Sequence, residues 1–156
     1  MREKTCCFTG HRELPIGKAD EIQVRLEEEL RYLIRQDVCD FMAGGALGFD
    51  TLAAGVVLKL KDEFEQLRLI LVLPCPEQAQ RWSQADIALY EETKLGADRV
   101  LYTADAYHPG CMQKRNKYLV EHSCCCICYM TKRKGGTKNT VDLCRKKGVQ
   151  VTNIAV

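Results

Sequence analysis

The stretch DFMAGGALGFD, residues 40–50, combines a short apolar run, a glycine-rich turn and the start of a helix-like segment. Its glycines are Gly44, Gly45 and Gly48. Glycine adopts positive φ and lets a ligand approach the backbone, and the first N–H groups of a helix lack partners within it. The helix dipole also favours negative charge there. The stretch therefore predicts a strand, a turn and a helix start that bind an anion such as phosphate, with the three glycines contributing backbone contacts.

Length and composition are typical of a globular chain with one domain over residues 1–156. Hydrophobic residues make up 46% and charged residues 28% of the sequence. No apolar run approaches the roughly 18 residues that span a bilayer, and the first ten residues do not resemble a signal peptide. We therefore expect a cytoplasmic protein that does not interact with membranes.

Ten cysteines are many for this length, and several lie inside apolar runs. Free cysteine behaves as a small buried hydrophobe, so we expect reduced thiols in the core. Cys125 and Cys128 form a C-x-x-C, but in a strand residues three apart point to opposite faces. No second Cys/His pair is evident, so no metal site is expected.

Apolar runs and segments of helical periodicity alternate along the chain. The expected strands cover residues 5–8, 41–43, 67–73, 97–102, 124–130 and 149–154, and the expected helices cover 20–36, 51–64, 78–95, 112–122 and 138–147. The strands are apolar on both faces, which is typical of a parallel sheet covered by helices on each side. The sequence predicts an α/β fold, a three-layer Rossmann-like domain with a mainly parallel sheet of about six strands.

Three loops follow expected strands and should meet at the carboxyl edge of the sheet, at residues 9–12, 44–50 and 135–137. Ligands of such folds bind at that edge, where the strand order reverses. Convergence of the loops requires the first, second and fifth strands to be neighbours. The third and fourth strands then lie toward one edge.

The first and second loops carry side chains suited to a phosphorylated ligand. Gly10 would let the backbone approach it, and Arg12 would pair with phosphate in a forked geometry. His11 is a hydrogen-bonding or acid–base candidate. Both charged side chains also fit an ordinary surface loop. Asp50 either caps the following helix, which we favour, or accepts hydrogen bonds from ribose hydroxyls.

The third loop, with Gly135, Gly136 and Thr137, again opens a helix. Thr137 is an N-cap candidate whose hydroxyl could instead meet phosphate. Arg115 and Asn116, at the start of another helix, are placed to reach a base or a sugar.

Three polar or aromatic residues after the third strand are harder to assign. Trp82 is either a core residue or a platform on which a base stacks. Gln78 and Arg81 have no better assignment than the surface.

Positive charge is concentrated in one part of the sequence. Residues 113–148 hold ten Lys and Arg against two acidic residues, a net charge of +8, so the remainder of this +2 chain carries −6. Such a segment could face nucleic acid or neutralise a phosphorylated ligand. For residues 145–147 a solvated helix surface is the preferred interpretation.

Neither G-x-G-x-x-G nor G-x-x-x-x-G-K-[ST] occurs, so a standard dinucleotide fingerprint and a P-loop are both absent. The motifs that do occur are FTGHR at 8–12, GGALGFD at 44–50, LPCPEQAQRW at 73–82, QKRN at 113–116 and GGT at 135–137. Together they resemble motifs of the SLOG superfamily, which joins DNA-processing protein DprA to the Lonely Guy (LOG) enzymes, and within it the stand-alone YpsA-like branch. The resemblance implies a Rossmann-like fold that binds nucleotides or nucleotide-derived, ADP-ribose-like ligands.

Two relatives suggest alternative activities. LOG enzymes cleave the N-glycosidic bond of nucleoside monophosphates with a P-G-G-x-G-T-x-x-E loop, where this chain has GGTKNTVD and Asp142 replaces the glutamate. The shorter carboxylate would need a backbone shift of about 1.5 Å, and a 1 Å misplacement can cost ~10²-fold in rate. The catalytic candidates for such hydrolysis would be Asp142 and Glu77. DprA-like proteins bind single-stranded DNA, but aromatic residues are only 7% of this sequence.

These observations favour a binding protein, a sensor or sequestering module, for a nucleotide-like small molecule. Whether it is also an enzyme stays open, and catalysis is the less favoured reading. We expect no cofactor. Nucleic acid is a less favoured partner, and this fold permits a homo-oligomer although no pattern indicates one.

Overall fold

Strands and helices alternate along the chain in the computed structural model, which describes residues 2–156. The strands are β1 (Thr5–Gly10), β2 (Asp40–Ala43), β3 (Arg68–Leu73), β4 (Arg99–Tyr102), β5 (Cys125–Tyr129) and β6 (Gln150–Asn153). The helices are α1 (Ala19–Arg35), α2 (Phe49–Lys61), α3 (Gln84–Gly96), α4 (Cys111–Glu121) and α5 (Gly136–Lys146), and a short 3-10 helix, η1 (Arg2–Lys4), precedes β1. Within this described part, no helix has the length and apolar content needed to cross a membrane.

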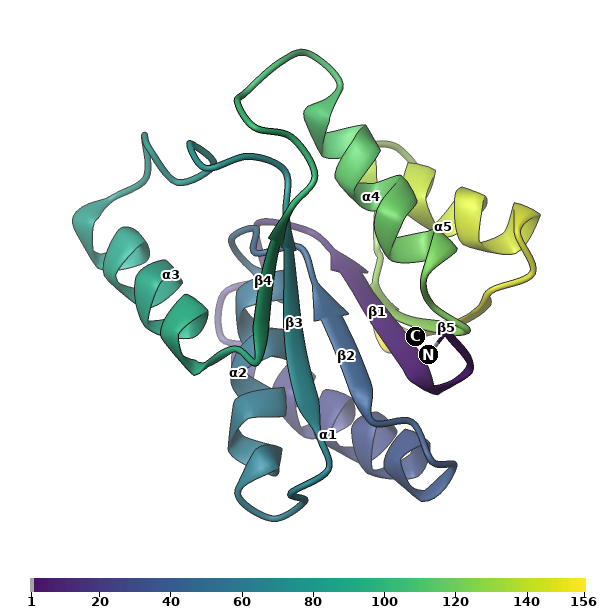
Figure 1. Cartoon of the computed structure of the whole chain (residues 1–156). Helices are drawn as coiled ribbons and strands as arrows, with labels where there is room; N and C mark the ends of the chain where they lie inside the picture. Colours follow the sequence, from purple (N-terminus) through teal and green to yellow (C-terminus); the bar gives the residue numbers. More distant parts are fainter. Residues whose placement is uncertain (1) are drawn as a thin grey trace.

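The six strands form one sheet in the order β4-β3-β2-β1-β5-β6, and every neighbouring pair is parallel. The chain builds outward from β1 to β4 and then returns to β5 on the other side of β1 (Figure 1). The predicted α/β class and the predicted neighbours of β1 are confirmed. The strand order reverses between β1 and β5, which is where ligands of open α/β sheets bind.

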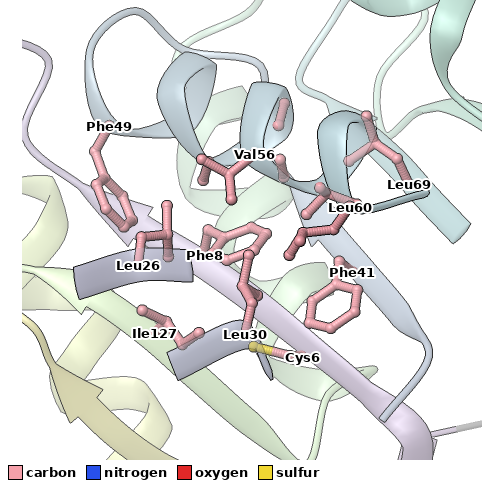
Figure 2. Close-up of a cluster of buried hydrophobic side chains, with 14 of the residues drawn as sticks. Cys6, Phe8, Leu26, Leu30, Phe41, Phe49, Val56, Leu60, Leu69 and Ile127 are labelled. Atoms are coloured by element: carbon pink, nitrogen blue, oxygen red, sulfur yellow. The ribbon is translucent and has the colours of Figure 1, made fainter. Parts of the chain in front are cut away.

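The larger apolar core lies between the sheet and helices α1 and α2, whereas α4 and α5 cover the opposite face (Figure 1). In α1 the apolar residues recur every three to four positions, so Leu26 and Leu30 are buried against the sheet (Figure 2). They pack beside Phe8 and Phe41, whose stacked rings lie 6.1 Å apart. Truncating a buried phenylalanine such as Phe8 to alanine costs about 3–5 kcal/mol, so this core holds the end of β1 in place.

The second core, on the α4 and α5 face, is rich in sulfur. All ten cysteines are free thiols, as predicted. Cys125 and Cys128 belong to different cores, so the C-x-x-C does face both sides of the sheet. Burial raises the pKa of Cys128 to about 11, which keeps that thiol protonated.

Three thiols do converge: the sulfur atoms of Cys7, Cys126 and Cys144 lie within 4.8 Å of one another. They come from three separate elements, β1, β5 and α5. All three are buried among apolar side chains of this second core. No short sequence motif joins them. Their packing among apolar neighbours agrees with cysteine acting as a small hydrophobe.

Candidate ligand-binding site

A cavity of about 410 Å³ opens at the carboxyl edge of the sheet, where β1, β2 and β5 end. The predicted binding residues that line it are Gly10, His11, Arg12, Asp50, Arg115, Asn116, Gly135, Gly136 and Thr137. Met112 and Glu13 also line it and were not predicted, whereas Lys132 and Lys134 belong to the basic segment that was expected to face nucleic acid or a phosphorylated ligand. The three loops therefore meet at one cavity, at the reversal of the strand order.

Gly44, Gly45 and Gly48 do not line this cavity, although we expected them to bind a ligand through their backbone. Gly48 has φ 78°, and a Cβ atom there would lie 2.2 Å from the carbonyl oxygen of Arg12. The N–H of Phe49 donates to the carbonyl of His11 at 3.1 Å. Gly48 thus lets the second loop pack directly against the first, whereas Gly44 and Gly45 face the side chains of Arg115 and Leu73.

Asp50 lies in the first turn of α2, one residue inside the helix, and Gly48 is the N-cap. The predicted capping role is therefore wrong, because the helix starts two residues earlier than its apolar pattern indicated. A carboxylate oxygen of Asp50 accepts a hydrogen bond from the N–H of Ala46 at 3.3 Å. Burial raises the pKa of Asp50 to about 6, although nearby Arg115 acts in the opposite direction.

Arg115 is a buried arginine on α4 that reaches under the second loop. Its Nη1 donates to the carbonyl oxygen of Gly44, and its Nε donates to Oδ1 of Asn116 at 2.8 Å. Burial lowers the pKa of Arg115, and Asp50 partly offsets that effect. The floor of the cavity therefore holds a guanidinium and a carboxyl group side by side.

His11 connects the first loop to residues 131 and 132, which lead into the third loop. Its Nε2 accepts hydrogen bonds from the N–H of Thr131 at 2.9 Å and of Lys132 at 3.3 Å. Because a backbone N–H can only donate, this nitrogen carries no proton, and the proton of the neutral ring lies on Nδ1. Burial and the charge of Lys132 lower the pKa of His11. This histidine is thus a structural acceptor, and its Nε2 is already occupied.

The third loop is open to the cavity. Gly135 is the N-cap of α5, with φ 110° and no side-chain cap, and Thr137 is buried inside the first turn. The predicted N-cap role of Thr137 is therefore wrong. A Cβ atom added at Gly135 or Gly136 would meet nothing within 4 Å. The first N–H groups of α5 are thus available to an anion at this end of the helix.

Cations line the rim. Arg12, Lys132 and Lys134 all contribute to the cavity wall, and none of them forms a salt bridge with another residue of the segment 2–156. Surface lysines and arginines elsewhere, such as Arg31 and Lys61, do have acidic partners. The exposed side of the cavity is therefore positive, in spite of Glu13 at its edge.

The catalytic candidates lie outside the cavity. Asp142 is on an exposed part of α5, where it forms an ion pair with Lys138. Glu77 lies in the turn after β3, and its Oε1 accepts from the N–H of Tyr107 at 3.4 Å. Neither carboxylate lines the wall formed by the three loops.

Gln78 was assigned to the surface, yet it supports the second loop. Its amide donates to the carbonyl of Gly44 at 3.3 Å and accepts from the hydroxyl of Tyr90 at 3.2 Å. Residues 76–81 form a turn, and α3 begins only at Gln84, where Ser83 caps the helix by accepting from the N–H of Asp86 at 3.1 Å. That serine–x–x–aspartate pattern was a usable signal for the later start.

The parallel sheet, its strand order and the cavity at the strand reversal define a Rossmann-like α/β protein with a cavity at its switch point. The chain belongs to the YpsA family, described as the YspA SLOG family, whose family model matches residues 6–153.

Several relatives have similar sequences. The SPbeta prophage-derived protein YoqJ of Bacillus subtilis, itself described as uncharacterized, is 28% identical over 131 residues, which cover 76% of this chain and 75% of YoqJ. A UPF0398 protein of Bacillus pumilus is 31% identical over 127 residues, covering 76% of this chain and 68% of that protein.

Solved structures of DNA processing protein A (DprA) share the fold. The protein from Streptococcus pneumoniae aligns with a TM-score of 0.70 at 17% identity, over 96% of this chain and 49% of that one. The Helicobacter pylori protein, whose structure is described by its single-stranded DNA binding mode, aligns with a TM-score of 0.65 at 16% identity, over 96% and 64%. This chain thus spans about half of the first DprA chain and under two thirds of the second.

Proposed function

We propose that this protein binds a nucleotide or a nucleotide-derived, ADP-ribose-like ligand in the cavity at the carboxyl edge, as a sensor or sequestering module. The observation that carries the proposal is a set of cations, Arg12, Lys132 and Lys134, that have no salt-bridge partner among residues 2–156 and line the same cavity as the open start of α5. Phosphate groups fit such a site because guanidinium, ammonium and helix N-terminal N–H groups all donate to their oxygens.

The test is isothermal titration calorimetry with nucleoside mono- and diphosphates and ADP-ribose. Arg12→Ala should weaken binding roughly 10- to 100-fold, because a hydrogen bond to a charged group contributes about 1.5–3 kcal/mol. Arg133→Ala is the matched control, since Arg133 is exposed on the third loop but does not line the cavity. Absence of saturable binding by every compound, with a folded sample, would refute the proposal.

A second candidate function is binding of single-stranded DNA. It is favoured by the fold shared with DprA and by three successive cations, Lys132, Arg133 and Lys134, of which the two lysines line the cavity. In that case the logarithm of the affinity for a dT oligonucleotide should fall with the logarithm of salt concentration, with a slope near −0.7 for each phosphate neutralised. An oligonucleotide that binds no more tightly than a mononucleotide would exclude it.

Hydrolysis of a nucleoside phosphate has less support, because neither Asp142 nor Glu77 lines this cavity and only Glu77 lines a neighbouring one. Free-base release from nucleoside monophosphates is its assay. If any release is detected, Asp142→Asn should abolish it, and an unchanged rate would remove Asp142 from consideration.

A further inference from the structure

A second cavity, of about 430 Å³, lies next to the first on the side of β3 and α4. The two share a wall residue, Met112, whose side chain lines both. The carbonyl of Gly44, which lines neither cavity, accepts from Arg115 of the first and from Gln78 of the second. The cavities are therefore adjacent compartments that have Met112 in common.

The second cavity differs from the first in chemistry. Its wall contains two aromatic rings, Trp82 and Tyr107, together with Arg81, the carboxylate of Glu77 and the amides of Gln78 and Gln80. Aromatic faces and guanidinium planes stack on nucleobases, and amides form hydrogen bonds with base edges. The first cavity offers cations and helix N–H groups instead, which suit phosphate.

The ring of Trp82 is held in a fixed position. It makes an edge-to-face contact with Tyr90, with ring centroids 5.2 Å apart and an interplanar angle of 80°. The hydroxyl of Tyr90 donates to Gln78, which in turn donates to Gly44. The contacts that hold Trp82 in place thus extend through Tyr90 and Gln78 to the carbonyl of Gly44. Tyr107, by contrast, is 65% exposed on the loop before α4.

We infer that the second cavity receives the nucleobase of the ligand whose phosphate occupies the first. This inference rests on the proposed function and narrows it. The ligand class becomes a base-bearing nucleotide that lies across Met112, with its base against Trp82 and Tyr107, and a bare sugar phosphate would fill only half of the site.

The experiment uses the full chain and compares ribose 5-phosphate with AMP, GMP, CMP, UMP and ADP-ribose. Trp82 is the only tryptophan in the sequence, so its intrinsic fluorescence reports on the second cavity alone. At least one base-bearing compound should quench that fluorescence and bind roughly tenfold or more tightly than ribose 5-phosphate. Ribose 5-phosphate should bind, by calorimetry, without quenching.

Three variants separate the compartments. Tyr107→Ala removes an exposed ring and should weaken only the base-bearing compound, roughly tenfold, while ribose 5-phosphate binding is unchanged. Trp82→Phe keeps a ring and should retain most of the affinity. Arg12→Ala should weaken both classes alike.

The inference is overturned if ribose 5-phosphate and every nucleotide bind equally and Tyr107→Ala alters neither. In that outcome phosphate binding in the first cavity stands and the base compartment does not. If no compound binds at all, the proposed function fails, and the base compartment fails with it.

Discussion

The two glycine-rich turns at the carboxyl edge look alike in sequence and differ in what surrounds them. Each follows a strand and leads into a helix. Gly44, Gly45 and Gly48 precede α2, whereas Gly135 precedes α5 and Gly136 is its first residue. In the first turn a Cβ atom on Gly48 would lie 2.2 Å from the backbone oxygen of Arg12. In the second, neither glycine would meet anything within 4 Å.

A glycine after a strand indicates that a side chain would not be tolerated there or is not needed. The glycine alone does not show whether protein atoms or a ligand lie next to it. In the first turn the space is occupied by the protein, namely the backbone of the first loop and the guanidinium of Arg115. In the second it opens toward the cavity. We therefore expect substitutions in the first turn to act mainly on stability, and on ligand affinity only through Arg115, whereas the second turn acts on ligand affinity.

Gly48→Ala should give the largest effect. Glycine adopts the positive φ of this position freely, whereas an L-residue there costs about 1–3 kcal/mol. In addition, the new methyl group would clash with backbone atoms that cannot move aside. We expect a loss of roughly 4 kcal/mol or more in the free energy of unfolding by urea denaturation. Gly135→Ala is the control, since its φ is also positive but its surroundings are open. Equal losses in the two variants would contradict the comparison.

Asp50, beneath the packed turn, should make stability depend on pH. Its pKa is about 6 in the folded protein and ~3.9 when unfolded, so the folded state binds the proton more tightly. Stability should therefore fall as the pH rises from about 4 to 6, by up to roughly 3 kcal/mol. Asp50→Asn, which mimics the neutral carboxyl, should remove this dependence. The measurement is the difference in unfolding free energy between the two proteins at each pH, and a constant difference would refute the prediction.

Gly44→Ala and Gly136→Ala compare the two turns without backbone strain, since neither glycine has positive φ. A methyl group on Gly44 would lie 2.5 Å from Nη1 of Arg115, so this side chain must shift. We expect a loss of about 1–3 kcal/mol in stability, as for other overpacked sites, and weaker nucleotide binding. Gly136→Ala should leave stability unchanged or raise it by about 0.4–1 kcal/mol. Urea denaturation and calorimetry on both variants test the pair, and a stable Gly44→Ala protein with full affinity would count against it.

The fold was accessible from sequence because it depends on local patterns. Apolar runs such as residues 67–73 indicated buried parallel strands, and requiring three loops to meet gave the neighbours of β1 correctly. The cavity followed for the same reason, since carboxyl ends of parallel strands share one edge.

The roles inside the site were not accessible, because they depend on contacts between distant segments. Asp50 was read as a cap, since the pattern does not reveal that Gly48 already starts α2. His11 has the residue type of an acid–base group, yet its ring accepts from residues 131 and 132, about 120 positions away. Gln78 looked like a surface residue because its partners, Gly44 and Tyr90, come from β2's loop and α3.

Lys134→Ala should produce the smallest change in stability and so gives the sharpest test of the open turn. Lys134 lines the cavity and forms no salt bridge with any residue from 2 to 156, so removing it should alter the unfolding free energy by less than about 0.5 kcal/mol. Nucleotide affinity should nevertheless fall several-fold, because a phosphate loses one nearby cation. Lys146→Ala, at the far end of α5, is the matched control and should leave affinity unchanged. The contradicting outcome is that both lysine variants weaken binding equally at low salt and that neither weakens it at high salt. The ligand would then be attracted by the general charge of the 113–148 segment, and the open turn would have no specific part in binding it.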